Sequence, residues 1–341
     1  MATSGTGFYF VRPIVTMPVI GIESSAHTLG VGIVSRGKVL ANSKRMYRIT
    51  DKGIIPARVA DFHSEGVAKT IGDALSKARV EASEIEAVGY TKGPGIGTCL
   101  GVGHLAAKVL AGRLNVPLIP VNHGLAHIEI ARHLHSMTDP LALYVSGGNS
   151  QILGLVERPH RHYHVYGETF DIGIGNMLDV FARAAGMNPA WGSSVAKSAA
   201  GGRYLKMPYT VKGMDFAFGG LLTHAIRRLG SDSVHDISFS LQETAFSMLC
   251  EATERALLLT GKRELVLCGG VAQSARLVEM IREMAEPHSV SIGIAPDEYN
   301  ADNGAMIAMV AERMLRAGMV PAAKECTIRQ RYRIDQARVG W

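Results

Sequence analysis

The sequence has few cysteines, and their arrangement does not suggest a site. Only four occur among 341 residues, and none lies in a C-x-x-C pair. This argues against a disulfide scaffold and against a thiolate zinc site, and it favours a reducing, cytoplasmic compartment. No run approaches the ~18 consecutive apolar residues that a membrane span needs, so no membrane partner is predicted.

Several catalytic motifs are also missing. The glycine-rich stretch 93–98 lacks the lysine of a P-loop, and its Pro94 removes an amide donor. The zinc-protease pattern H-E-x-x-H is absent, because Gly124 follows His123. No Ser-His-Asp or Cys-His set is evident. These absences count against a P-loop enzyme, a zincin protease and a hydrolase that forms a covalent intermediate.

What is present favours a large folded protein. Apolar residues make up 47% and charged residues 19% of the chain, which is ample for a core. The length predicts two domains or one bilobal body. The net charge of +6 is concentrated: the window 36–58 holds seven basic residues against one acid, and 324–338 holds five against two. Two such windows are either solvated faces or contacts for a phosphate backbone.

Two local patterns each occur twice along the chain. A strand, a polar turn and a returning strand are predicted over 19–34 and again over 141–156. A short strand, a glycine turn and a helix are predicted from 85 and again from 264. This repetition indicates an internal duplication. With amphipathic helices predicted near 57–78, 236–260 and 303–317, it places the chain in the α/β class.

The glycine turns have two readings. Turns made of Ser, Thr and Gly leave backbone N–H groups free and can cradle phosphate oxygens. They can also simply reverse the chain. Because the set is duplicated, both copies would face one cleft, which favours a nucleotide or polyphosphate between two lobes.

Two histidines, His123 and His127, share one face of a predicted helix. Their i, i+4 spacing suits a divalent metal held by two imidazoles. Chance produces about 0.5 such pairs among 13 histidines, so spacing alone leaves a structural role open. Asp302 precedes a predicted helix and is either part of its cap or a carboxylate ligand. A second pair, His160 and His164, lies in a run that alternates like an exposed strand.

Several stretches, in this order, resemble one family. The chain resembles the universal tRNA N6-adenosine threonylcarbamoyltransferases, formerly described as O-sialoglycoprotein endopeptidases. Tyr144 before Ser-Gly-Gly and the Pro-Tyr-Thr-Val-Lys-Gly run at 208–213 resemble the archaeal and eukaryotic branch, the catalytic subunit of the KEOPS/EKC complex. The similar stretches are 21–28, 53–56, 60–65, 93–97, 121–127, 144–151, 167–179, 208–218 and 302–307.

The resemblance implies a duplicated actin-like ATPase fold, with two lobes around a central cleft. We expect a leader over residues 1–16 and a first lobe over 17–140. The second lobe is expected over 141–302, and the helix 303–320 is expected to pack back on the first lobe. Residues 321–341 would form a basic C-terminal tail.

The resemblance also implies the site residues. A divalent metal, with iron expected and zinc the alternative, would be bound by His123, His127, Tyr144 and Asp302. The donor would be threonylcarbamoyl-AMP, and ATP or ADP analogues would occupy the same cleft. Two positions depart from the family: Ala196 replaces its usual glutamate and Ser274 its asparagine. The residues expected to bind substrate are Tyr144, Val145, Ser146, Gly147, Gly148, Asp179, Gly192 and Ser274.

The activity implied is transfer of the threonylcarbamoyl group to N6 of the adenosine 3′ of the anticodon in ANN-decoding tRNAs. The transfer would be a metal-assisted acyl transfer without a side-chain nucleophile. Expected partners are tRNA, a small atypical protein kinase subunit and a small dimerising subunit of a KEOPS-type complex. The alternatives are an ATPase or kinase of the same fold, a metalloprotease, and a non-enzymatic scaffold that binds nucleotide.

Overall fold

A computed structural model describes residues 17–47 and 54–341 of the chain. The expected leader, residues 1–16, lies outside the described residues, as do Arg48 and Lys52 of the first basic window. Within the described ranges, no helix is both long and apolar enough to cross a membrane.

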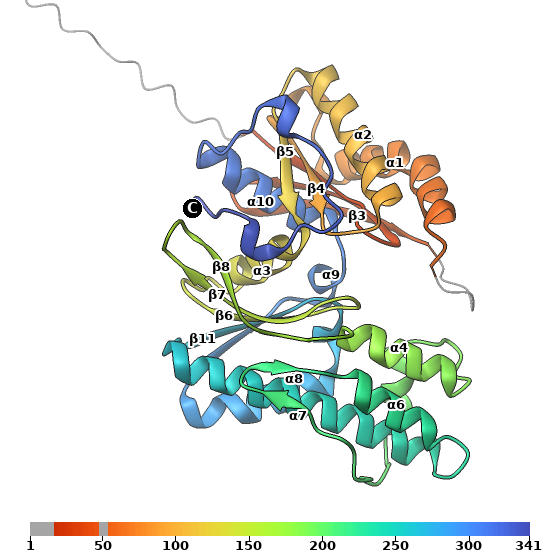
Figure 1. The fold of residues 1–341 in the computed structure, drawn as a ribbon. Helices are drawn as coiled ribbons and strands as arrows, with labels where there is room; N and C mark the ends of the chain where they lie inside the picture. Colours follow the sequence, from red (N-terminus) through yellow and green to blue (C-terminus); the bar gives the residue numbers. More distant parts are fainter. Residues whose placement is uncertain (1–16, 48–53) are drawn as a thin grey trace, which may run out of the picture.

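The first of two five-stranded sheets has the strand order β3-β2-β1-β4-β5 (Figure 1). Strands β1 to β3 form an antiparallel meander, and β4 and β5 run parallel to β1. Apolar side chains alternate along β1 and β2 toward helices α1 and α2 on the outer face. The elements are β1 (Val19–Glu23), β2 (Thr28–Ser35), β3 (Lys38–Met46), α1 (Pro56–Ala78), β4 (Ala87–Gly93), α2 (Gly97–Leu114) and β5 (Leu118–Asn122).

The second sheet repeats this topology, with the order β12-β11-β6-β7-β8. Strands β6 to β8 form the meander, and β11 and β12 run parallel to β6. The internal duplication predicted from the sequence is therefore confirmed. The strands are β6 (Leu141–Val145), β7 (Ser150–Val156), β8 (His162–Glu168), β11 (Glu264–Cys268) and β12 (Ser291–Ile294).

Helices complete a layered arrangement (Figure 1). The outer face of the second sheet packs against α4 to α8, while α3 and α10 lie between the two sheets and share one core with both. The predicted helices near 57–78, 236–260 and 303–317 correspond to α1, α7 and α10. The remaining elements are α3 (His123–Leu134), α4 (Ile174–Ala184), α5 (Gly192–Ala199), β9 (Val211–Lys212), β10 (Asp215–Phe216), α6 (Gly219–Arg227), α7 (Val234–Thr260), α8 (Ala275–Ala285), α9 (Asp297–Asn300) and α10 (Gly304–Arg316).

Helix α10 packs on β1 and β2 at backbone distance because glycines face it. A Cβ built at Gly32 would lie 2.2 Å from the amide nitrogen of Ala305, and one built at Gly304 would lie 2.2 Å from that of Gly32. Only glycine leaves room for such an approach. The N-terminus of α10, and the loop before it, are thereby held against the first sheet.

Residues 326–341, which we call the C-terminal strap, cross from the first sheet to the second (Figure 1). The strap begins beside β4, where the Arg329 amide donates to the carbonyl of Lys92 at 2.7 Å. It ends beside β8, where the Val339 amide donates to the carbonyl of Arg161 at 2.9 Å. Ile334, between these points, is buried in the core shared by both sheets.

Candidate functional site

The histidine pair lies where β5 ends and α3 begins. Asn122 is the N-cap of α3, since its Oδ1 accepts the Leu125 amide at 3.0 Å. The cap fixes His123 as the first helical residue and places His127 one turn further, on the same face. Both side chains are buried, and their ring centroids are 4.7 Å apart.

Asp302 reaches this pair from the loop before α10. Its Oδ1 lies 3.2 Å from His127 Nε2 and 3.5 Å from His123 Nε2. The capping role belongs to its neighbour Asn303, whose Oδ1 accepts the Met306 amide at 2.9 Å. Both roles predicted for this motif are therefore present, but on different residues. Asn303 caps α10, and the carboxylate of Asp302 faces the histidines.

These three side chains could bind one metal ion. Each offers a donor atom, and the donor atoms all lie within 4.8 Å of one another. Tyr144, at the end of β6, stacks beside His127 with ring centroids 5.5 Å apart. Its buried hydroxyl has no hydrogen-bond partner among the described residues. Imidazole, carboxylate and phenol oxygen are a suitable donor set for iron or zinc, so the residues present fit a divalent metal.

Glu23 contacts His123 at the ring nitrogen that does not face Asp302. This carboxylate is fully buried at the end of β1, and its Oε2 lies 3.0 Å from His123 Nδ1 and accepts from Thr91 Oγ1 at 2.7 Å. Its Oε1 accepts the Ser25 amide at 2.6 Å. A carboxylate on the far ring nitrogen leaves the Nε2 of His123 available to a ligand, as is common at metal sites.

Burial and neighbouring charges act in opposite directions on the pKa values of these side chains. Burial lowers the pKa of His123, but the charges of Glu23 and Asp302 outweigh burial and raise it to about 9. Burial raises the pKa of Asp302, yet the two histidines bring it well below its usual range. For His127 burial dominates, and its pKa is lowered. The site therefore concentrates negative charge opposite the two imidazoles, which suits a cation.

The loop after β6 lies beside these side chains. Ser146 closes it, because its amide donates to the Asn149 carbonyl at 2.7 Å and its Oγ accepts the Asn149 amide at 3.1 Å. Among the described residues, the amides of Gly147 and Gly148 have no acceptor. Two free amides on adjacent glycines can bind an anionic oxygen.

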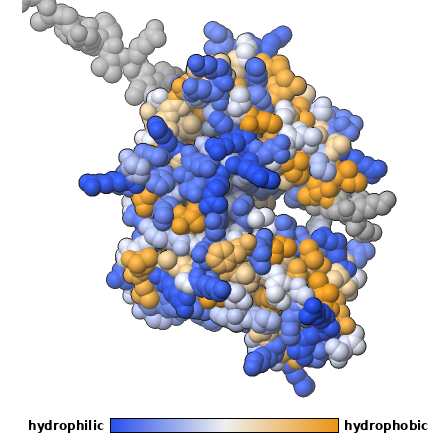
Figure 2. Space-filling view, in the orientation of Figure 1, coloured by the Kyte–Doolittle hydropathy of each residue, from blue (hydrophilic) through white to orange (hydrophobic). Residues whose placement is uncertain are grey.

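One cavity of about 350 Å³ joins these features. The polar turn after β1 and the glycine-containing turn after β6 both contribute to it, and the surface is hollowed between the two halves (Figure 2). Its volume lies in the range of ~300–1,000 Å³ usual for small-molecule sites. The lining residues include Ser25, His27, His123, Tyr144, Ser146, Gly147, Gly148, Asn149, Asn176, Asp179 and Asp302.

The other residues expected to bind substrate differ in how they relate to the cavity. Asp179 lines the cavity, and burial raises its pKa. Gly192 contributes indirectly, since its amide donates to Asp179 Oδ1 at 2.7 Å. The Val145 side chain points into the core of the second half. Ser274 precedes α8 and Ala196 is exposed on α5, and neither is among the residues that line the cavity.

Sequence reasoning missed Glu23 and Asn176. The sequence does offer a signal for Glu23, because an acid at the end of an otherwise apolar strand indicates a buried carboxylate. Glu129 is close to the histidines in the sequence but points away from them, and it accepts from Tyr163 Oη at 2.6 Å and from Trp341 Nε1 at 2.7 Å.

Comparison with known families gives one match over most of the chain. Residues 36–309 match the model of the tRNA N6-adenosine threonylcarbamoyltransferase family. The enzyme of that name from Thermococcus sibiricus is 44% identical over 328 residues, which cover 95% of this chain and all of that protein. A probable bifunctional tRNA threonylcarbamoyladenosine biosynthesis protein from Methanothermobacter thermautotrophicus is 43% identical, and the match covers 95% of this chain and 61% of that protein.

Solved structures show the fold. HypF from T. kodakarensis matches 88% of this chain with a TM-score of 0.63 at 16% identity, and the match covers 48% of that chain. The activator of 2-hydroxyisocaproyl-CoA dehydratase from Clostridium difficile matches 89% of this chain with a TM-score of 0.51 at 13% identity, and covers 97% of that chain. These likenesses concern the fold alone, and they confirm the actin-like ATPase fold.

Proposed function

This chain belongs to the tRNA N6-adenosine threonylcarbamoyltransferase family, and we propose that it transfers a threonylcarbamoyl group to N6 of an adenosine in tRNA. The observation that carries the proposal is the convergence of His123, His127 and Asp302 beside the free amides of Gly147 and Gly148 in one cavity. A cation site next to an anion-binding loop suits a donor that carries both a carboxyl-derived group and a phosphate.

We propose that His123, His127, Asp302 and Tyr144 would bind one divalent metal, with iron the expected ion and zinc the alternative. Such an ion would supply Lewis-acid polarisation of a substrate carbonyl and a binding point for its oxygens. Within the protein, Glu23 orients the His123 ring, and the cap at Asn303 positions the Asp302 carboxylate.

The donor we propose is threonylcarbamoyl-AMP, whose phosphate would accept hydrogen bonds from the amides of Gly147 and Gly148. Asp179, held by the Gly192 amide, would accept from a hydroxyl of the donor. N6 of the acceptor attacks the carbamoyl carbon, the bond to the phosphate oxygen breaks, and AMP leaves with that electron pair. The N6 nitrogen loses one proton, which passes to the leaving phosphate or to water. ATP or ADP analogues would bind in the same cavity.

The acceptor we propose is the adenosine 3′ of the anticodon in ANN-decoding tRNAs. We further propose that the chain works with a small atypical protein kinase subunit and a small dimerising subunit, as in a KEOPS-type complex. Support for a linked second activity comes from the relative named as bifunctional, of which this chain spans 61%. The free cysteines support a reducing, cytoplasmic compartment.

The test is a reconstituted reaction with tRNA, threonine, bicarbonate, ATP, the enzyme that makes the threonylcarbamoyl adenylate, and the partner subunits. Wild-type protein is expected to convert adenosine to the threonylcarbamoyl nucleoside, detected by mass spectrometry of digested tRNA. His123→Ala is expected to abolish the product with unchanged circular dichroism, while His164→Ala, at an exposed histidine of β8, keeps it. Product formed by His123→Ala without bound metal would reject the site, and ATP turnover without tRNA would favour a kinase or ATPase.

A further inference from the structure

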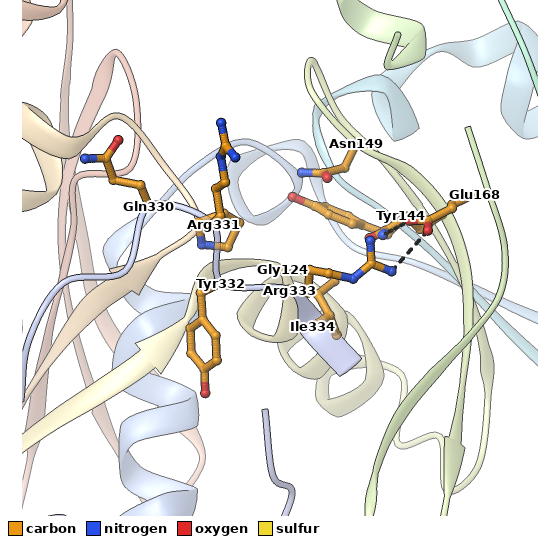
Figure 3. Close-up of a pocket in the computed structure, with 11 residues that line it drawn as sticks. Gly124, Tyr144, Asn149, Glu168, Gln330, Arg331, Tyr332, Arg333 and Ile334 are labelled. Carbon is orange, nitrogen blue, oxygen red and sulfur yellow. Dashed lines mark hydrogen bonds and ion pairs between the residues drawn. The ribbon is translucent and has the colours of Figure 1, made fainter. Parts of the chain in front are cut away.

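A second cavity lies beside the first, on the side of the C-terminal strap (Figure 3). Its volume is about 230 Å³. Pro94, Tyr144 and Asn149 line both cavities, so the two cavities adjoin at these residues. The other lining residues are Gly124, Gln151, Glu168, Gln330, Arg331, Tyr332, Arg333 and Ile334.

The part of the C-terminal strap that lines this cavity is held by hydrogen bonds to neighbouring segments. The Gln330 carbonyl accepts the Gly95 amide at 3.2 Å, and the Tyr332 carbonyl accepts from Asn122 Nδ2 at 2.9 Å. Arg331 lies between these two anchored residues. Ile334, which follows, is 4% exposed and packs against Gly124 of α3. The backbone that carries Arg331 is therefore held in place from both sides.

Of the two arginines that line the cavity, one has a carboxylate partner among the described residues and the other has none. Arg333 pairs with Glu168 Oε1 at 3.0 Å, and Gln151 Nε2 donates to Oε2 of the same carboxylate at 2.8 Å. Arg331 is exposed and has no carboxylate partner within the described part of the chain, and Figure 3 shows its side chain directed away from Glu168. Two arginines and one glutamate give the cavity lining a net charge of +1. An unpaired guanidinium beside a neutralised pair is suited to an incoming anion.

The surroundings extend this positive character. Arg329 is exposed and stacks over the Tyr332 ring at 5.3 Å. Lys92 Nζ lies over the same ring at 5.8 Å. Figure 2 shows strongly hydrophilic residues gathered across the middle of the molecule, at the height of the strap. Several phosphates of one polyanion could therefore be contacted near the mouth of the cavity.

We propose that this second cavity receives the acceptor nucleotide of tRNA and that Arg331 binds a backbone phosphate next to that nucleotide. The inference rests on the proposed function, because it assigns the acceptor side of the same reaction. The donor phosphate has its own amides at Gly147 and Gly148, on the first cavity. A bimolecular transfer needs both reactants at one point, and the shared wall at Tyr144 and Asn149 is where the two cavities meet.

The test compares Arg331→Gln with Arg282→Gln, a matched change at an exposed arginine of α8 that lines neither cavity. Both variants are assayed in the reconstituted reaction, with separate titrations of tRNA and of the donor. Arg331→Gln is expected to raise the KM for tRNA about tenfold, the usual worth of one charge-assisted contact, with the KM for the donor unchanged. For Arg331→Gln, the slope of log tRNA affinity against log salt concentration should be smaller in magnitude by about 0.7, the value for one phosphate contact on a single strand.

The outcomes separate the two proposals. Equal KM values for tRNA in Arg331→Gln and Arg282→Gln, with wild-type turnover intact, would overturn the acceptor assignment alone. A raised KM for the donor instead would also overturn it, by moving Arg331 to the donor side. No tRNA product from wild-type protein with its partners would reject the proposed function itself. Loss of binding of a partner subunit by Arg331→Gln, with unchanged affinity for isolated tRNA, would show that the cavity receives a protein segment and would overturn the proposal.

Discussion

Gly32→Ala should disturb the candidate metal site although residue 32 lies in a strand and does not line the cavity. The new Cβ would lie 2.2 Å from the amide nitrogen and 2.4 Å from the Cα of Ala305. Ordinary contacts of a Cβ begin near 3.4 Å, so α10 would have to withdraw by about 1 Å or more. Both sides of this contact are backbone, and no side chain can rotate away to relieve it.

The consequence reaches the site through the helix N-terminus. Asn303 caps α10, and Asp302 precedes it, so a shift of the first turn moves the carboxylate away from His127. Overpacking of this kind costs about 1–3 kcal/mol of folding free energy. Misplacing one ligand of a metal site lowers affinity by about 10–100-fold, as seen when supporting residues are changed.

The assay combines thermal unfolding with metal titration, using Gly72→Ala as the control. Gly72 is exposed on α1, and a Cβ there meets nothing within 4 Å. That substitution should stabilise the protein by about 0.5–1 kcal/mol, because alanine is the better helix former. A Gly32→Ala protein with wild-type melting temperature and wild-type metal affinity would refute the reasoning.

Two further predictions concern single carboxylates. Glu23→Gln should keep the fold but lower metal affinity by roughly 10–100-fold, because His123 loses the charged partner on its Nδ1; metal content after dialysis that equals wild type would contradict this. Burial raises the pKa of Asp171, but hydrogen bonds from the amides of Phe218, Ile172 and Gly219 bring it below its usual value. The carboxylate therefore stabilises the native state above about pH 4, and this contribution is lost as pH falls through the folded pKa. The melting-temperature gap between wild type and Asp171→Asn should narrow between about pH 5 and pH 3, and a gap that stays constant over this range would count against the assignment.

Much of the architecture could be predicted because it depends on local patterns. Strand and helix periodicity revealed α1, α7 and α10, and the repeated strand-turn units predicted the duplicated sheets. The helix pitch places residues four apart on one face, so the His123 and His127 pairing was predictable from spacing. The division into lobes at residues 140 and 302 stays a proposal.

Contacts between distant residues depended on the tertiary structure. Asp302 is 175 positions from His127 and Glu23 is 100 positions from His123, and no local pattern carries such distances. The C-terminal strap is a second example. Its basic residues are evident in the sequence, but the sequence does not show which of them form ion pairs. Packing decided that Arg333 meets Glu168 while Arg331 stays unpaired in the described chain.

The sequence by itself thus determined the duplicated α/β fold, the helix that presents two imidazoles, and the family. The resemblance to the family implied Asp302 as a ligand beside those imidazoles, whereas the tertiary structure alone showed that Glu23 contacts His123 and where the strap crosses between the two halves. The physical reason is that helix and strand periods are set by neighbouring residues, whereas the glycine-mediated approach of α10 to β1 and β2 brings together segments nearly 300 residues apart, as Gly21 and Ala308 show.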